Sequence, residues 1–183
     1  MRCGSRLAPV RVAPDESAER VTELLLGEPV DVVAVEGEWV RVVTTYAYPG
    51  WVRADELEEG EGQVVADAEG PPLEVARSYL GAPYLWGGMS EAGIDCSGLV
   101  HMAHRRIGRL VPRDARDQDA VAATVDDPAP GDLVTYGDPV DHVAFWLGGG
   151  AILHASGREE VECVVAEPEP EALRRRRRGF RRL

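Results

Sequence analysis

The sequence predicts an α+β protein with a small β domain followed by a larger mixed domain. Short β-rich runs occupy residues 8–57, and from residue 73 onward helical segments come first and strands follow. Helices followed by strands, without strict alternation, favour α+β over α/β. Residues 58–72 are acidic and rich in glycine, which is typical of a linker. We therefore expect domains at 1–57 and 73–183.

Residues 8–57 are expected to form a small β-barrel. The runs PVDVVAVE and EWVRVVTT are rich in β-branched residues and are separated by Gly37, which predicts two short strands. GWVRADEL supplies a further strand, and its neighbours Pro49 and Gly50 favour a turn. Five short strands in a segment of this length predict a barrel.

The C-terminal part begins with two predicted helices. PLEVARSYLG predicts a helix over 73–81 that ends at Gly81, and CSGLVHMAHRRIG predicts a second helix over 96–108. One face of this second helix carries residues at steps of four, three and four, namely Cys96, Val100, Ala103 and Ile107.

A β region is expected after Pro130-Gly131. Four β-rich runs separated by Gly and Pro turns predict its strands: DLVTY, HVAFWLG, AILHAS and VECVV. The arginine-rich end, RRRRRGFRRL, is expected to be a solvated helix end or a frayed tail. A basic tail that binds anionic polymers is the alternative.

Composition and charge exclude several classes of function. A formal net charge of −12 disfavours nucleic acid as a partner and suits a small substrate with a cationic group. No run approaches the roughly 20 apolar residues of a membrane span. The N-terminus lacks the apolar run of a signal peptide, so we expect a cytoplasmic location. The odd cysteine set (Cys3, Cys96, Cys163), without metal-ligand spacing, predicts neither a disulfide framework nor a structural zinc site.

Cys96 is the candidate nucleophile. It lies in DCSGLV, where a loop enters the second predicted helix. The positive end of the helix dipole and the free N–H groups of the first turn favour a thiolate there. A small buried hydrophobic residue is the alternative, since free cysteines are usually buried.

His142 and His154 are the candidate base and its orienting partner. They lie in two predicted strands joined by the glycine turn 148–150, and an antiparallel hairpin would bring the two side chains together. A Cys–His pair needs a third group to fix the tautomer of the base. Zinc bound by these two histidines and Cys96 is the less favoured alternative, because no HxxxH or CxxC pair is present. His101 and His104 are expected to be solvated.

The motifs resemble those of the NlpC-type cell-wall peptidases, a papain-like family. DCSGLV, PGDLVTY and HVAFWLGGGAILHASG carry the resemblance over roughly residues 70–167. It implies a papain-like α+β fold, a Cys96–His142–His154 triad, no metal or cofactor, and cleavage of peptidoglycan stem peptides after γ-linked D-glutamate. GEPVDVV, EWVRV and GWVRADEL resemble a bacterial SH3-like domain.

The pairing of the two domains resembles the γ-D-glutamyl-L-diamino-acid endopeptidases that recycle wall peptides, which require a free amine on L-Ala. The resemblance implies that a tyrosine of the SH3-like domain caps the site; Tyr48 is the first candidate and Tyr46 the second. It assigns the remaining substrate contacts to Tyr84, Trp86, Asp95, Ser97, Arg113 and Asp114. The group has a serine after the last of these residues, where this chain has Ala115.

Two other functions remain open on the sequence. The same triad serves an amidase or an acyltransferase acting on another γ-glutamyl or wall substrate. An inactive module that holds wall fragments is the other alternative, although the intact Cys–His–His set speaks against it. The expected partner is a small murein peptide, with the diamino acid (diaminopimelate or lysine) and the oligomeric state left open.

Overall fold

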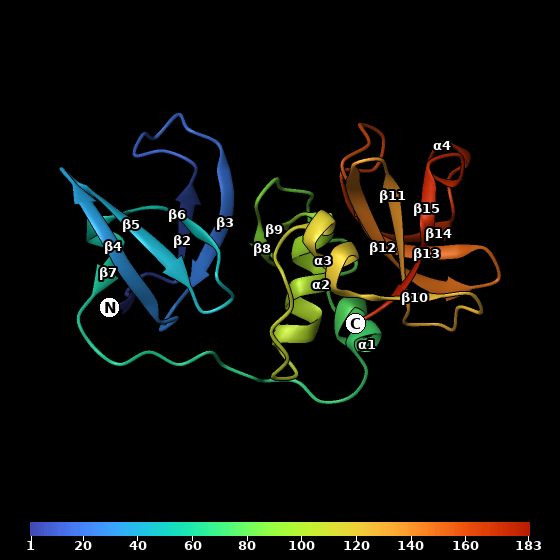
Figure 1. Cartoon of the computed structure of the whole chain (residues 1–183), viewed down its shortest axis with the longest axis horizontal. Helices are drawn as coiled ribbons and strands as arrows, with labels where there is room; N and C mark the ends of the chain where they lie inside the picture. The colour runs from blue at the N-terminus through green and yellow to red at the C-terminus, as the bar shows by residue number, and fades with distance from the viewer.

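The computed structural model describes residues 1–183 as two β-rich parts with helices between them. Figure 1 shows helices α1 to α3 in the middle of the molecule, with the N-terminal β domain on one side and the C-terminal sheet on the other. No helix combines the length and the apolar character that spanning a membrane requires. The α+β prediction is confirmed.

The N-terminal domain contains seven strands and one short 3-10 helix: β1 (Arg2–Cys3), β2 (Leu7–Arg11), β3 (Arg20–Leu25), β4 (Val30–Glu36), β5 (Trp39–Thr44), β6 (Pro49–Arg53), η1 (Ala54–Glu56) and β7 (Leu57–Glu58). Five of the strands form one sheet in the order β3-β2-β6-β5-β4, and β1 pairs with β7. The predicted barrel is therefore an open sheet whose edges are β3 and β4. Its core is a cluster of valines with Cys3, Ala8 and Leu24.

The predicted turn at Pro49-Gly50 is wrong. Both residues belong to β6, and the chain reverses earlier, where Ala47 has a positive φ of 60°. A Cβ at Gly50 would lie 2.3 Å from Cγ1 of Val10. The glycine is needed here because two strands approach closely, which is the other common role of glycine in a strand.

The acidic linker runs along both domains without regular structure between β7 and α1. The backbone N–H of Gln63 donates to the carbonyl of Gly27 at 2.9 Å, and that of Ala68 donates to the carbonyl of Arg106 at 2.9 Å. Arg106 also pairs with Asp67 at 2.7 Å. The linker therefore contacts each domain and is more than a solvated spacer.

The C-terminal domain contains four helices and eight strands: α1 (Pro72–Arg77), β8 (Met89–Ser90), β9 (Gly93–Ile94), α2 (Cys96–Arg105), α3 (Ala115–Val121), β10 (Ala123–Val125), β11 (Leu133–Gly137), β12 (Val140–Gly148), β13 (Ala151–Ser156), β14 (Cys163–Pro168), α4 (Glu171–Arg174) and β15 (Arg177–Arg182). The two predicted helices are present but shorter than expected. Six strands form one sheet in the order β10-β15-β11-β12-β13-β14.

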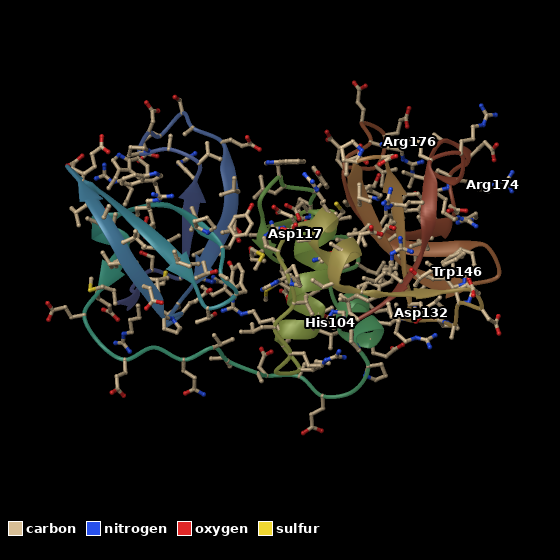
Figure 2. All side chains as sticks on the ribbon, viewed as in Figure 1. His104, Asp117, Asp132, Trp146, Arg174 and Arg176 are labelled. Atoms are coloured by element: carbon tan, nitrogen blue, oxygen red, sulfur yellow. The ribbon has the colours of Figure 1, made fainter.

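The prediction of a frayed or solvated arginine-rich end is wrong. After the one-turn helix α4, residues 177–182 form β15, which lies between β10 and β11 in the sheet. Figure 2 shows Arg174 at the edge of the molecule farthest from the N-terminal domain. Arginines of β15 pair with acidic residues from distant elements, for example Arg182 with Asp132 at 2.6 Å and Arg181 with Asp119 at 2.8 Å.

Helix α2 is buried along its whole length, which overturns the prediction that His101 and His104 are solvated. His101 is fully buried and its Nδ1 lies 2.7 Å from the carbonyl oxygen of Val111. His104, labelled at the lower end of α2 in Figure 2, lies with its Nδ1 2.8 Å from the carbonyl of Val100 and stacks on Phe145. The apolar stripe predicts only one covered face, but the N-terminal domain covers part of the opposite face.

A buried ion pair joins the two domains. Arg105, at the end of α2, donates to Glu28 of the N-terminal domain at 2.9 Å, and both side chains are almost inaccessible to solvent. The same carboxylate accepts the backbone N–H of Leu25 at 3.0 Å. Breaking a buried pair leaves a charge without a partner, which is more costly than losing an exposed pair.

We therefore expect Arg105→Leu to lower the free energy of unfolding by about 3–5 kcal/mol, because Glu28 stays buried without a counter-charge. Asp67→Asn, which breaks the more exposed pair with Arg106, is the control and should cost less than about 1 kcal/mol. Urea unfolding of both variants measures the difference. Equal decreases in the free energy of unfolding would show that the interdomain pair stabilises the protein no more than the exposed pair does.

Candidate active site

Cys96 is the first residue of α2, as the sequence predicts. The side chain of Asp95 caps the helix, since its Oδ1 accepts the backbone N–H of Gly98 at 2.6 Å. Burial, followed by the neighbouring charge of Asp95, raises the pKa of the Cys96 thiol to about 12. The expected stabilisation of a thiolate by the helix terminus is therefore outweighed by desolvation and by the adjacent carboxylate.

His142 and His154 contact each other across the predicted hairpin. Strands β12 and β13 pair antiparallel around the glycine turn 148–150, which confirms the hairpin. Nε2 of His142 lies 2.8 Å from Nδ1 of His154, with the rings nearly perpendicular at 80°. Burial lowers the pKa of His142 to about 3, and burial also lowers that of His154. Both imidazoles are therefore neutral near pH 7.

Strand β12 passes directly beside the thiol. The backbone of Val143, the residue after His142, lies near the Cys96 sulfur and partly offsets the rise of its pKa. The elements that carry Cys96 and His142, α2 and β12, therefore pack against each other. Near pH 7 the Cys96 thiol and the His142 imidazole are therefore both neutral.

A cleft of about 320 Å³ lies in front of Cys96 and is lined by both domains. Its lining residues are Glu19, Val21 and Tyr48 from the N-terminal domain, and Trp86, Asp95, Cys96, Ser97, Asp114, Ala115, Arg116, Val140 and Asp141 from the C-terminal domain. A larger cavity of about 610 Å³ lies at the linker side of the interface, around Tyr79 and Arg105, and contains none of the three triad residues.

Tyr48 reaches into the cleft and contacts the C-terminal domain. Its hydroxyl donates to Oδ2 of Asp114 at 3.0 Å, and its side chain lines the cleft on the side of the N-terminal domain. Tyr46, the second candidate, is half-buried outside the cleft, where its hydroxyl contacts Thr22 and its ring packs against His101. Burial raises the pKa of Asp114, and the Tyr48 hydrogen bond partly offsets that rise.

Trp86 and Glu19 form a second contact between the domains at the cleft. The indole N–H of Trp86 donates to Oε1 of Glu19 at 2.7 Å, while the tryptophan is 58% exposed. Trp86 is therefore a cleft residue and not a packed core side chain. Glu19 is a lining residue that the sequence does not single out, because it lies among other acidic residues in an irregular loop. Only the domain packing brings it to the cleft.

Asp95 and Arg113 form a buried pair behind the cleft. Arg113 donates to Oδ1 of Asp95 at 2.9 Å and to Oδ2 at 2.7 Å, and Gly87 N–H donates to the same Oδ2 at 2.8 Å. Arg113 also reaches the hydroxyls of Ser97 and Thr22. Arg113 is 2% exposed and does not line the cleft. The charge of Asp95 is thus already matched, and Arg113 supports the site from behind.

Tyr84 lies beside the nucleophile without lining the cleft. Burial, followed by the nearby Cys96 and Asp95, raises the pKa of its hydroxyl. Its ring is so close to Gly157 that a Cβ there would lie 3.0 Å from the ring. The glycine in the loop after β13 therefore leaves room for this tyrosine near Cys96.

The zinc alternative finds no support in the arrangement of side chains. No group of three or more His, Cys, Asp or Glu side chains is placed to hold a metal ion. The two histidine nitrogens that face each other already share a hydrogen bond.

Comparison with known proteins identifies both domains. The NlpC/P60 family model matches residues 81–176, and the model of the bacterial dipeptidyl-peptidase Sh3 domain matches residues 10–57. The γ-D-glutamyl-L-lysine dipeptidyl-peptidase of Bacillus subtilis (strain 168) is 26% identical over 211 residues, covering 73% of this chain and 71% of the relative. Dipeptidyl-peptidase 6 of Lysinibacillus sphaericus is 42% identical over 93 residues, covering 49% of this chain and 33% of the relative.

Solved structures show the same fold. An NlpC/P60 family protein from Bacillus cereus ATCC 10987 matches 99% of this chain and 62% of its own, with a TM-score of 0.58 and 24% identity. The peptidoglycan hydrolase RipB from Mycobacterium tuberculosis matches 61% of this chain and 62% of its own, with a TM-score of 0.53 and 34% identity. The chain thus spans only part of each relative. The prediction of an SH3-like domain followed by a papain-like domain is confirmed. Because the family model matches more than half of its residues, the chain belongs to the NlpC/P60 family.

Proposed function

We propose that the chain is a cysteine peptidase that cuts the γ-D-glutamyl–diamino acid bond of murein peptides whose N-terminal L-Ala has a free amine. The observation that carries the proposal is the cleft, which has Cys96 in its wall and is lined on the other side by the N-terminal domain. The names of two relatives, a γ-D-glutamyl-L-lysine dipeptidyl-peptidase and a dipeptidyl-peptidase 6, support this choice of bond. We place the activity in the cytoplasm, in the recycling of wall peptides.

In the proposed reaction, His142 takes the thiol proton of Cys96 as sulfur attacks the γ-carbonyl of D-Glu. The negative oxygen is stabilised by the backbone N–H of Cys96, which as the first residue of α2 has no acceptor within the helix. His142 then gives its proton to the leaving amine of the diamino acid, and a thioester remains. Water, deprotonated by the same histidine, hydrolyses the thioester and releases L-Ala-γ-D-Glu.

The free amine of L-Ala is proposed to bind between the domains, at Asp114 and Glu19. Both carboxylates line the cleft, and the hydrogen bond from Tyr48 fixes Asp114. Asp95 contributes less charge than the resemblance implies, because Arg113 already pairs with both of its oxygens. An acylated amine is uncharged and cannot pair with these carboxylates, and Tyr48 of the SH3-like domain lines the cleft where an attached glycan chain would have to pass. Intact wall is therefore not a substrate in this proposal.

The test is incubation of the protein with L-Ala-γ-D-Glu-diamino acid tripeptides and, separately, with isolated intact peptidoglycan, followed by mass spectrometry of the soluble products. We expect the dipeptide L-Ala-γ-D-Glu from the tripeptides and no soluble peptide from intact wall. Release of peptides from intact wall at a comparable rate would contradict the proposal and favour a general wall endopeptidase.

We expect a bell-shaped pH dependence of kcat/KM that Asp114→Asn alters on the acidic side. Asp114 must be ionised to accept an ammonium group, and its raised pKa means that it becomes protonated at a higher pH than an ordinary aspartate. Activity is therefore lost as the pH falls through that raised pKa. On the alkaline side it is lost above about 8, where an α-amine loses its proton. In Asp114→Asn the acidic limb should move to lower pH; an unchanged limb would assign it to another group.

A further inference from the structure

We propose that Glu167, held by Arg158, is a positioning residue that sets the tautomers of both catalytic histidines. The inference rests on the proposed function, since it assigns a role toward the base of that reaction. Glu167 lies on β14 and touches neither Cys96 nor the cleft, so it would act only through His154.

The register of the sheet brings Glu167 to His154. Strands β13 and β14 are antiparallel, with His154 opposite Val165 and Ile152 opposite Glu167. Glu167 is therefore the diagonal neighbour of His154 on the same face, within reach of a long side chain. Nε2 of His154 lies 3.0 Å from Oε1 of Glu167. The histidine is 2% exposed, so this contact is shielded from water.

Arg158 determines which partner donates. Its guanidinium donates to both oxygens of Glu167, at 2.8 Å each. A carboxylate paired in this way is ionised and can only accept hydrogen bonds. The hydrogen between His154 and Glu167 must therefore lie on Nε2 of His154.

The tautomer of His154 in turn determines the tautomer of His142. A neutral His154 with hydrogen on Nε2 has a lone pair on Nδ1, which must accept from Nε2 of His142, 2.8 Å away. A neutral His142 with hydrogen on Nε2 has its lone pair on Nδ1, and that nitrogen is the one left to take the thiol proton of Cys96. Without the carboxylate, both histidines could instead carry hydrogen on Nδ1, with His154 donating to Nε2 of His142. In that arrangement Nδ1 of His142 has no lone pair to accept the thiol proton.

Glu167→Gln tests the role directly. The side-chain amide of glutamine can donate to Nε2 of His154 and so favours the reverse tautomers. We expect kcat to fall about 10²-fold with KM changed less than about 3-fold, a smaller loss than the roughly 10⁴-fold cost when the residue that contacts the catalytic histidine itself is changed in the same way. Glu160→Gln, which removes the same charge from an exposed position in the loop before β14, is the control and should keep full activity.

A spectroscopic readout separates this role from a structural one. In protein labelled with ¹⁵N-histidine, we expect His142 and His154 both to carry hydrogen on Nε2, and to shift toward Nδ1 in Glu167→Gln while the melting temperature stays within a few degrees. Arg158→Gln should give a smaller change in the same direction. Wild-type kcat together with unchanged tautomers in Glu167→Gln would overturn the inference.

The same spectra distinguish the two proposals. If the wild-type protein cuts no γ-glutamyl peptide but Glu167→Gln still changes the histidine tautomers, the proposed function fails and the positioning role stands. If the peptide is cut equally well by both proteins and the tautomers are the same, only the positioning role fails.

Discussion

Replacing Cys96 by alanine is expected to lower kcat/KM by about 10⁴-fold or more, without unfolding the protein. The reaction proposed here passes through a thioester on this sulfur, and no other side chain of the cleft is a comparable nucleophile. Cys96 is buried at the start of α2 and belongs to the main hydrophobic core, but alanine keeps its Cβ and removes only the sulfur, so the protein should stay folded.

Cys163→Ser is the matched control. Cys163 is half-buried at the beginning of β14 and lies outside the cleft, so its loss should leave activity intact. Peptide hydrolysis measured by chromatography, with circular dichroism on each variant, checks the pair. A Cys96→Ala protein that retains near-full activity would rule out nucleophilic catalysis by this residue.

Acetylating the L-Ala amine of the substrate is expected to lower kcat/KM by about 10²-fold or more. This corresponds to the roughly 3 kcal/mol that is lost when one partner of a buried charge pair is removed. Asp114 and Glu19 line the cleft, and Oδ2 of Asp114 already accepts from Tyr48 at 3.0 Å. The ammonium group of the free peptide compensates these carboxylates for their loss of water. The neutral amide of the acetylated peptide would remove the same water and provide no compensating charge.

Asp114→Asn should narrow the gap between the two peptides, because it weakens binding of the free amine more than that of the acetylated one. Asp117→Asn, at an exposed position of α3 that does not line the cleft, is the control and should keep the full preference. Steady-state kinetics on both peptides measure the ratio. Equal rates for free and acetylated peptides with the wild-type protein would contradict recognition of the amine.

The positions of Cys96, His142 and His154 in the fold could be predicted from the sequence because each depends on a local signal. Cys96 follows a capping aspartate at a helix start, and His142 and His154 lie on two strands joined by a glycine turn. The distance between the histidines follows from the hairpin. The raised pKa of the Cys96 thiol could not be predicted in this way, because burial and Asp95 raise it whereas the helix terminus favours a lower value.

The parts that could not be predicted depend on contacts between distant segments. Glu19 reaches the cleft only through the packing of the two domains, and Glu167 reaches His154 only through the register of β13 and β14. His101 is buried because the N-terminal domain covers α2 on the face opposite to its apolar stripe, where Tyr46 packs on its ring. A single sequence carries no signal for such contacts.

The structure of the arginine-rich end could not be predicted from helix propensity or from charge pattern. Arginine is a good helix former, and a run of like charges is usually solvated. Here each arginine pairs with at least one carboxylate, for example Arg182 with Asp132 and Arg177 with Glu169, and residues 177–182 form an inner strand of the sheet. Tertiary partners therefore decide the structure of this segment.

The central claim is hydrolysis of the γ-glutamyl bond through Cys96, and cleavage in H₂¹⁸O tests it most directly. The protein is incubated briefly with L-Ala-γ-D-Glu-diaminopimelate in labelled water, and the masses and the label positions of the products are determined by mass spectrometry. We predict one ¹⁸O atom in L-Ala-γ-D-Glu, located in its γ-carboxyl group, none in the diamino acid, and no products with Cys96→Ala. Label in free L-Ala, unlabelled transfer products, or labelled dipeptide from Cys96→Ala would contradict the account.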